Sequence, residues 1–139
     1  MSRRTHADEA ATARRLAGTL IASIKRVTAV DPTRRVAIEF ETKCGRVVHL
    51  SGRGTVDDGH PPSESPPALT LRDGPFAPTA RRTLEDLTGA ARVAFAGRPR
   101  VVTLQAAGSD HVEAWCLTFD TGHALVWADL SGAPLVRSP

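Results

Sequence analysis

The chain of 139 residues is poor in aromatic residues and cysteines and has no tyrosine. Its two cysteines, Cys44 and Cys116, belong to no CxxC pair, which excludes a disulfide framework and makes reduced thiols the expectation. The longest apolar patch, "LIASI" at residues 20–24, is far shorter than the ~20 residues of a membrane-spanning helix. The pair Arg3-Arg4 lacks the apolar segment of an export signal after it. These absences predict a cytoplasmic protein without a membrane partner.

The motifs of the easily recognised enzymes are also missing. The chain has no phosphate-binding loop, dinucleotide fingerprint, HExxH helix or GxSxG elbow. The triplet "DTG" at residues 120–122 occurs in aspartic proteases, but nothing else of that architecture accompanies it, and Asp120 is expected to accept hydrogen bonds within its own turn. We therefore predict neither a bound cofactor nor a metal.

Length and composition indicate one globular domain over residues 1–139. Residues 1–8 are expected to be flexible, and the proline-rich segment 57–68 to form a connecting loop that is disordered in part. Of the 18 basic residues, 16 are arginines, and Ala, Gly and Pro are frequent, as in proteins of GC-rich bacteria.

Residues 9–29 carry apolar residues at the three- and four-residue spacing of a helix, namely Leu16, Leu20, Ile24 and Val27. Asp8 is the candidate N-cap. Gly18 weakens this helix by ~1 kcal/mol relative to alanine, so a break or a close contact near it is an alternative.

From residue 36 the apolar period changes to two, which predicts a hairpin over residues 36–50 with Gly45 in its turn. Further strands are expected at about 91–96, 100–106, 111–119 and 123–130. Leu69 and Leu71 predict a short edge strand. Residues 78–89, "PTARRTLEDLTG", predict a short helix with Thr79 as cap and Gly89 as its end.

The hairpins at 36–50 and 115–127 have matching apolar rows, and "TARR" precedes each of them, at 12–15 and 79–82. A duplication of a helix and a hairpin is one interpretation, and chance similarity in an Ala- and Arg-rich chain is the other. Each hairpin should bury one apolar face. In the first, the opposite face carries Glu39, Glu41 and His49, which should meet water.

The opposite face of the second hairpin is apolar as well, because it offers Ala114, Cys116, Ala124 and Val126. A strand pair that is apolar on both faces must be covered on both, and the N-terminal helix is the expected cover. The predicted fold class is therefore α+β, with an N-terminal helix packed on an antiparallel β-sheet.

The densest group of reactive side chains is "DHVEAWC", residues 110–116. On a strand, His111 and Glu113 project to one face, where they can form a general acid/base pair or two metal ligands. The structural alternative places both at the solvent end of a strand. Cys116 should behave as a buried apolar group, and Cys44 as the more accessible thiol in an ordinary turn.

The first 35 residues hold eight of the 18 basic residues but only three of the 15 acidic ones. Phosphate contacts of a nucleic acid are one explanation of this asymmetry. The candidate contacts are Arg14, Arg15, Lys25, Arg26, Arg34 and Arg35. Only 4% of the residues are aromatic, however, so few side chains are present on which bases could stack.

By elimination, the first hypothesis is a small non-catalytic interaction protein of accessory, regulatory or immunity-like type, with a protein partner. A nucleic-acid-binding protein and a small enzyme with a His/Glu site are the alternatives. Pairing of edge strands between subunits would also give a homodimer.

Overall fold

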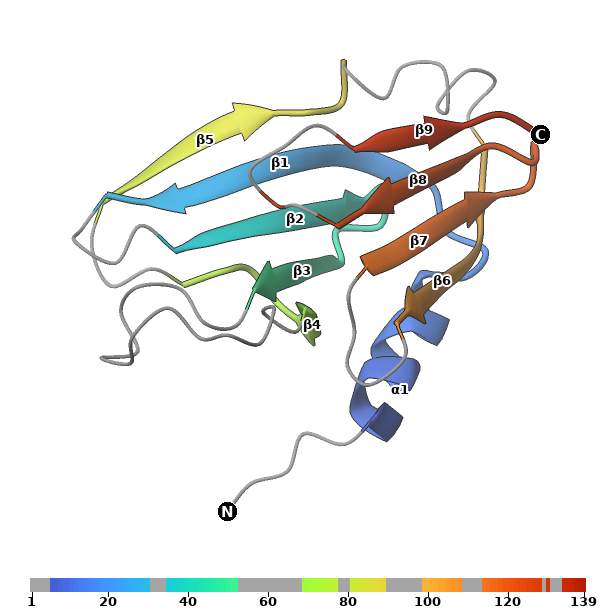
Figure 1. The fold of residues 1–139 in the computed structure, drawn as a ribbon, viewed down its shortest axis with the longest axis horizontal. Helices are drawn as coiled ribbons and strands as arrows, with labels where there is room; N and C mark the ends of the chain where they lie inside the picture. Colours follow the sequence, from blue (N-terminus) through green and yellow to red (C-terminus); the bar gives the residue numbers. More distant parts are fainter. Residues whose placement is uncertain are drawn as a thin grey trace.

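The computed structural model describes residues 6–30, 35–52, 69–77, 81–89, 99–108, 114–128, 130 and 134–139. Within these, a single helix precedes a series of strands (Figure 1). The elements are α1 (His6–Leu16), β1 (Ile21–Ala29), β2 (Val36–Thr42), β3 (Val47–Gly52), β4 (Leu69–Asp73), β5 (Arg82–Asp86), β6 (Val101–Ala107), β7 (Ala114–Phe119), β8 (Ala124–Trp127) and β9 (Leu135–Arg137).

The strands form two antiparallel sheets. One has the order β4-β3-β2-β1-β5, and the other has the order β6-β7-β8-β9. The α+β class with an N-terminal helix and antiparallel sheet is thereby confirmed. No helix in the described part of the chain is long and apolar enough to cross a membrane.

The core lies between the two sheets, where the apolar rows of both predicted hairpins meet. Phe40 of β2 contacts Trp127 of β8 edge-on, with ring centroids 5.0 Å apart. Ile38, Leu117 and Leu125 are also almost completely buried there. Burying one such side chain stabilises the fold by ~1.5–3 kcal/mol, so this row of contacts holds the sheets together.

The expected hairpin turns and edge strand are present. Gly45 and Gly122 close the β2–β3 and β7–β8 turns with φ of 92° and 91°, a conformation that favours glycine. β6 matches the strand expected at 100–106, and β8 is shorter than expected. β7 lies within the strand expected at 111–119, of which residues 111–113 lie outside the described residues. β4 is the edge strand predicted from Leu69 and Leu71. The strand expected at 91–96 and the loop at 57–68 lie outside the described residues.

The helix predicted over residues 9–29 is wrong in its second half. α1 spans His6–Leu16, so Asp8 lies inside this helix and is not its N-cap. Gly18 follows with φ of 81°, and its N–H donates to the carbonyl of Val101 at 2.7 Å. β1 then carries the rest of the segment.

The spacing that suggested a helix has a different cause in β1. Its residue Ile24 joins the core between the sheets, whereas Val27 lies on the opposite face with Ala37 and Phe76. A strand that is buried on both faces, with a register shift between Ile21 and Ser23, imitates a three-residue period.

The short helix predicted over residues 78–89 is also wrong where it is described, because Arg82–Asp86 forms strand β5. Val30 donates its N–H to the carbonyl of Arg81 at 2.7 Å, and Leu87 donates to Ile24 at 2.8 Å. Pairing with β1 therefore overrides the local helical preference of this segment. Thr79 lies outside the described residues.

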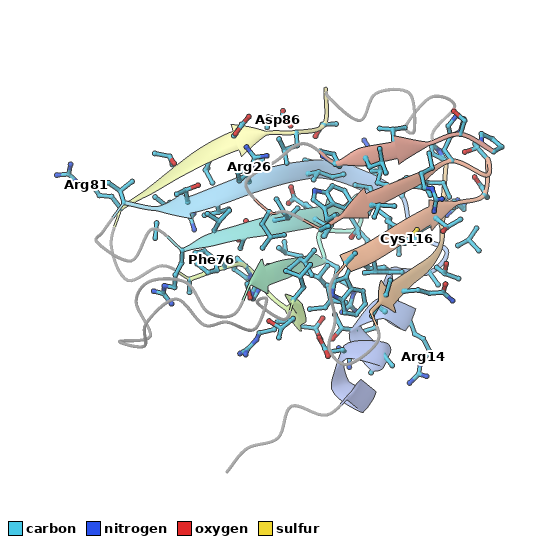
Figure 2. All side chains as sticks on the ribbon, in the orientation of Figure 1. Arg14, Arg26, Phe76, Arg81, Asp86 and Cys116 are labelled. Carbon is cyan, nitrogen blue, oxygen red and sulfur yellow. The ribbon has the colours of Figure 1, made fainter. Side chains whose placement is uncertain are left out.

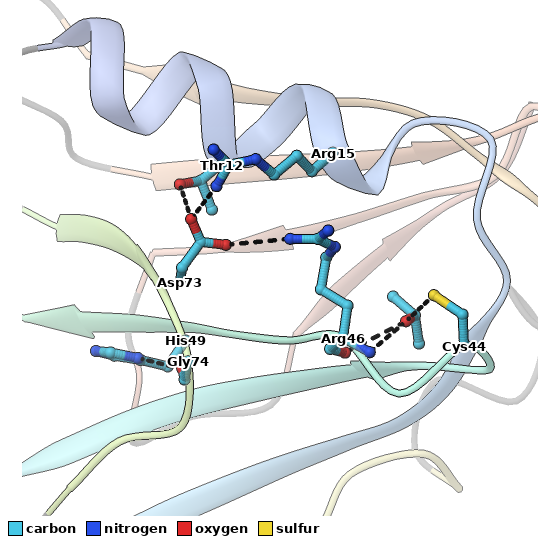
Figure 3. Close-up of polar contacts among 8 residues, drawn as sticks. Thr12, Arg15, Cys44, Arg46, His49, Asp73 and Gly74 are labelled. Carbon is cyan, nitrogen blue, oxygen red and sulfur yellow. Dashed lines mark hydrogen bonds and ion pairs between the residues drawn. The ribbon is translucent and has the colours of Figure 1, made fainter.

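The helix α1 lies beside β4 and β6, one edge of each sheet (Figure 1). The buried carboxylate of Glu9 accepts the backbone N–H of Leu71 in β4 at 2.9 Å. The Thr12 hydroxyl donates to Asp73 at 3.1 Å, and Arg15 forms an ion pair with the same carboxylate (Figure 3). The helix thus covers the β4 edge, a standard protection against unwanted strand pairing. The expectation that it covers the second hairpin is wrong.

Candidate binding surfaces on the outer sheet faces

A row of charged side chains crosses the outer face of the five-stranded sheet. Directly paired residues of antiparallel strands share a face, and Lys25 of β1 pairs with both Asp86 and Glu39. Glu39 pairs with His49, which in turn pairs with Arg72 on β4. Asp86, Lys25 and Glu39 alternate in sign, so opposite charges are neighbours in this part of the row.

Phe76, which follows β4, covers part of this face. Its ring packs with Val27 and Ala37 and lies edge-on to the imidazole of His49, with centroids 6.0 Å apart. The backbone N–H of Phe76 donates to the Glu39 carboxylate at 2.5 Å. Nδ1 of His49 lies 2.8 Å from the carbonyl oxygen of Gly74. His49 is buried, so the expectation that it meets water is wrong.

The outer face of the four-stranded sheet carries a different kind of side chain. One row across it consists of Gln105, Cys116, Val126 and Leu135. The neighbouring row consists of Thr103, Thr118, Ala124 and Arg137. Arg137 is the only charged residue in these two rows, and Leu135 is 62% exposed. We call this surface the uncharged face.

Among the basic residues predicted to contact a nucleic acid, those that the structure describes do not form one surface. Arg14 is exposed on α1, and Arg15 is paired with Asp73. Lys25 and Arg26 point to opposite faces of β1, and Arg26 pairs with Glu85 and donates to the Leu130 carbonyl. Figure 2 shows Arg14 and Arg26 in separate parts of the molecule.

Arg35 lies beside the Phe76 ring, with its guanidinium carbon 5.7 Å from the ring centroid. Arg34 lies outside the described residues. Nucleic-acid binding through these side chains stays a prediction.

The predicted acid/base candidates His111 and Glu113 also lie outside the described residues, so that site stays a prediction. Within the described ranges, no three His, Cys, Asp or Glu side chains gather as metal ligands do. His123, which follows the β7–β8 turn, has Nδ1 3.1 Å from the Thr121 hydroxyl. This contact joins two residues of the same turn and has a structural role.

The two thiols differ in environment. Cys44 is exposed in the β2–β3 turn, as expected, and a hydrogen bond with the Thr42 hydroxyl lowers the pKa of its thiol. Figure 3 shows this contact beside Arg46. Cys116 is half-buried on the uncharged face. The accessible thiol therefore belongs to a turn, and no base among the described residues is hydrogen-bonded to it.

Comparisons with protein-family models, with curated proteins and with solved structures find no match to this chain. The Phe76 cover and the full charged row were not predicted from the sequence. Both depend on the pairing of strands that are far apart in the chain. The local sign of the charged row was the predicted polar face of the first hairpin, which holds Glu39 and His49.

Proposed function

We propose that this chain is a small non-catalytic protein-binding module whose partner docks on the uncharged face. The observation that carries this proposal is the composition of the two rows across the four-stranded sheet, which hold a single charged residue. The outer face of the other sheet is charged and partly covered by Phe76. Protein interfaces are depleted of charge at their centres, as this face is.

The chemistry of the face favours a protein over a nucleic acid. Phosphate binding requires several cations, and Arg137 is the only one in these rows. Base stacking requires exposed aromatic rings, and both rows consist of Ala, Thr, Cys, Val, Leu, Gln and Arg. Short apolar and hydroxyl side chains across this sheet suit an apolar protein surface of complementary shape.

The test is quantitative enrichment from an extract of the source cells with the wild-type chain and two variants. Leu135→Glu places a charge at an exposed position of the uncharged face, so it should leave folding intact. Glu41→Arg changes a charge at an exposed position on the outer face of the other sheet. Thermal unfolding of all three proteins checks that each is folded.

We expect at least one protein to be retained equally by the wild type and Glu41→Arg, and to be depleted about tenfold or more by Leu135→Glu. Retention of every associated protein by Leu135→Glu would overturn the proposal. Loss caused by Glu41→Arg instead would assign binding to the other sheet.

A further inference from the structure

We propose that two copies of this chain associate through strand β5, edge to edge and antiparallel, about a two-fold axis at Leu84. Within the described residues β5 pairs with β1 alone, and all five of its residues are exposed. The dimer would join two five-stranded sheets into one. It uses a different surface from the proposed partner site, so either proposal can fail without the other.

The backbone of β5 is oriented for such pairing. The carbonyl of Arg81 and the N–H of Leu87 both bond to β1. Backbone groups alternate in direction along an antiparallel strand. The N–H and carbonyl groups of Arg82, Leu84 and Asp86 therefore point away from β1, toward the open edge.

The sequence of β5, "RTLED", is complementary to itself in this register. A two-fold axis at Leu84 places Arg82 opposite Asp86 of the partner subunit, and Asp86 opposite the partner's Arg82. Leu84, which is 54% exposed, meets the partner's Leu84. Moving the axis by two residues in either direction would instead place two arginines or two aspartates opposite each other, which is repulsive.

The same register continues the rows of the outer sheet face across the axis. Leu84 pairs with Val27, which pairs with Ala37, so an apolar row would run through both subunits. In the charged row, Glu39, Lys25 and Asp86 alternate in sign, and the partner's Arg82 would supply the next positive charge. A second copy thus fits this edge in hydrogen bonding, charge and apolar contact together.

The other edges are less suited to the same role. α1 lies along β4 and β6. β9 is only three residues long and follows Pro134, so it offers few backbone groups. The argument for self-association therefore rests on β5.

The decisive experiment exchanges the charges. Arg82→Asp and Asp86→Arg each place like charges opposite each other in a homodimer, so each variant alone should be monomeric. An equimolar mixture of the two variants restores opposite charges at both ends of the strand pair and should dimerise. Sedimentation equilibrium measures the wild type, the two variants and their mixture, at up to about 1 mM protein because a five-residue edge is a small interface.

A backbone test accompanies the exchange. Leu84→Pro removes an outward N–H while leaving the bonds to β1, since an edge strand tolerates proline there. Circular dichroism and thermal unfolding verify that each variant folds. The matched control, Val102→Pro, changes another exposed apolar residue, on β6.

We expect a wild-type dimer that Leu84→Pro abolishes and Val102→Pro preserves, together with a heterodimer in the mixture. A wild type that is monomeric at every concentration would overturn the proposal. A dimer insensitive to Leu84→Pro would overturn it too, as would a mixture that stays monomeric. Pairing of β5 only with another protein's strand, detected as a stable complex lost in Leu84→Pro, would also count against it.

Discussion

The outer faces of the two sheets are built by the same antiparallel pairing but differ in their side chains. On the five-stranded sheet, charges alternate from Asp86 through Lys25 to Glu39, and Phe76 covers part of the surface. On the four-stranded sheet, short uncharged side chains from Gln105 to Leu135 cross the face. Covering a charged face whose neighbouring charges have opposite signs contributes little free energy of association. Burying an uncharged face contributes more, because apolar surface is removed from water.

The largest expected difference concerns stability. Phe76→Ala should lower the free energy of unfolding by about 3 kcal/mol, because the ring is buried against Val27 and Ala37. Val126→Ala, at a half-buried position of the uncharged face, should lower it by about 1 kcal/mol or less. Urea unfolding of both variants measures the difference. Equal losses would show that the two faces are covered to the same degree.

The two hairpin turns provide a second comparison. Gly45→Ala should lower the free energy of unfolding by about 1 kcal/mol, because the φ of Gly45 is positive and no atom of the described residues lies near the new Cβ. Gly122→Ala should cost more, about 2 kcal/mol, because the new Cβ would lie 2.9 Å from the Cβ of Pro139. Thermal unfolding compares them.

The control for this second comparison is deletion of Pro139. Without Pro139, Gly122→Ala should lower the free energy of unfolding only as much as Gly45→Ala does. A difference that survives the deletion would mean that Pro139 is not its cause.

The smallest expected effect distinguishes the two thiols. Because the Thr42 hydrogen bond lowers the pKa of Cys44, more of this thiol is ionised at a given pH than in an ordinary cysteine. Cys44 should therefore react with iodoacetamide at neutral pH before Cys116 does. Thr42→Val should raise the pKa of Cys44 and move its alkylation profile to higher pH. Mass spectrometry of the alkylated peptides follows both sites, and an unchanged profile in Thr42→Val would contradict the assigned cause.

The sequence predicted the parts of the fold that depend on short-range patterns. The alternation at Val36, Ile38 and Phe40 and the glycines at 45 and 122 specify the two hairpins locally. Residues 21–29 and 82–86 were misassigned to helices because their strands pair with each other, a long-range contact that no local period contains. For β1, burial on both faces further hid the two-residue period.

The candidate surfaces were predicted less well than the fold. The uncharged face was predicted to be apolar from Ala114, Cys116, Ala124 and Val126, but α1 was wrongly predicted to cover it. The position of that helix depends on Glu9 reaching Leu71 and on Arg15 reaching Asp73, contacts between segments about sixty residues apart. Sequence spacing carries no information on contacts of this kind.

The most direct test of the proposed function is site-specific photo-crosslinking in the source cells, with the photoreactive residue at position 126 or at position 41. We predict an adduct with another protein from position 126 that is absent from position 41 and disappears when Leu135→Glu is added. An adduct of the same partner from position 41 alone, or an adduct from position 126 that contains only two copies of this chain, would contradict binding through the uncharged face.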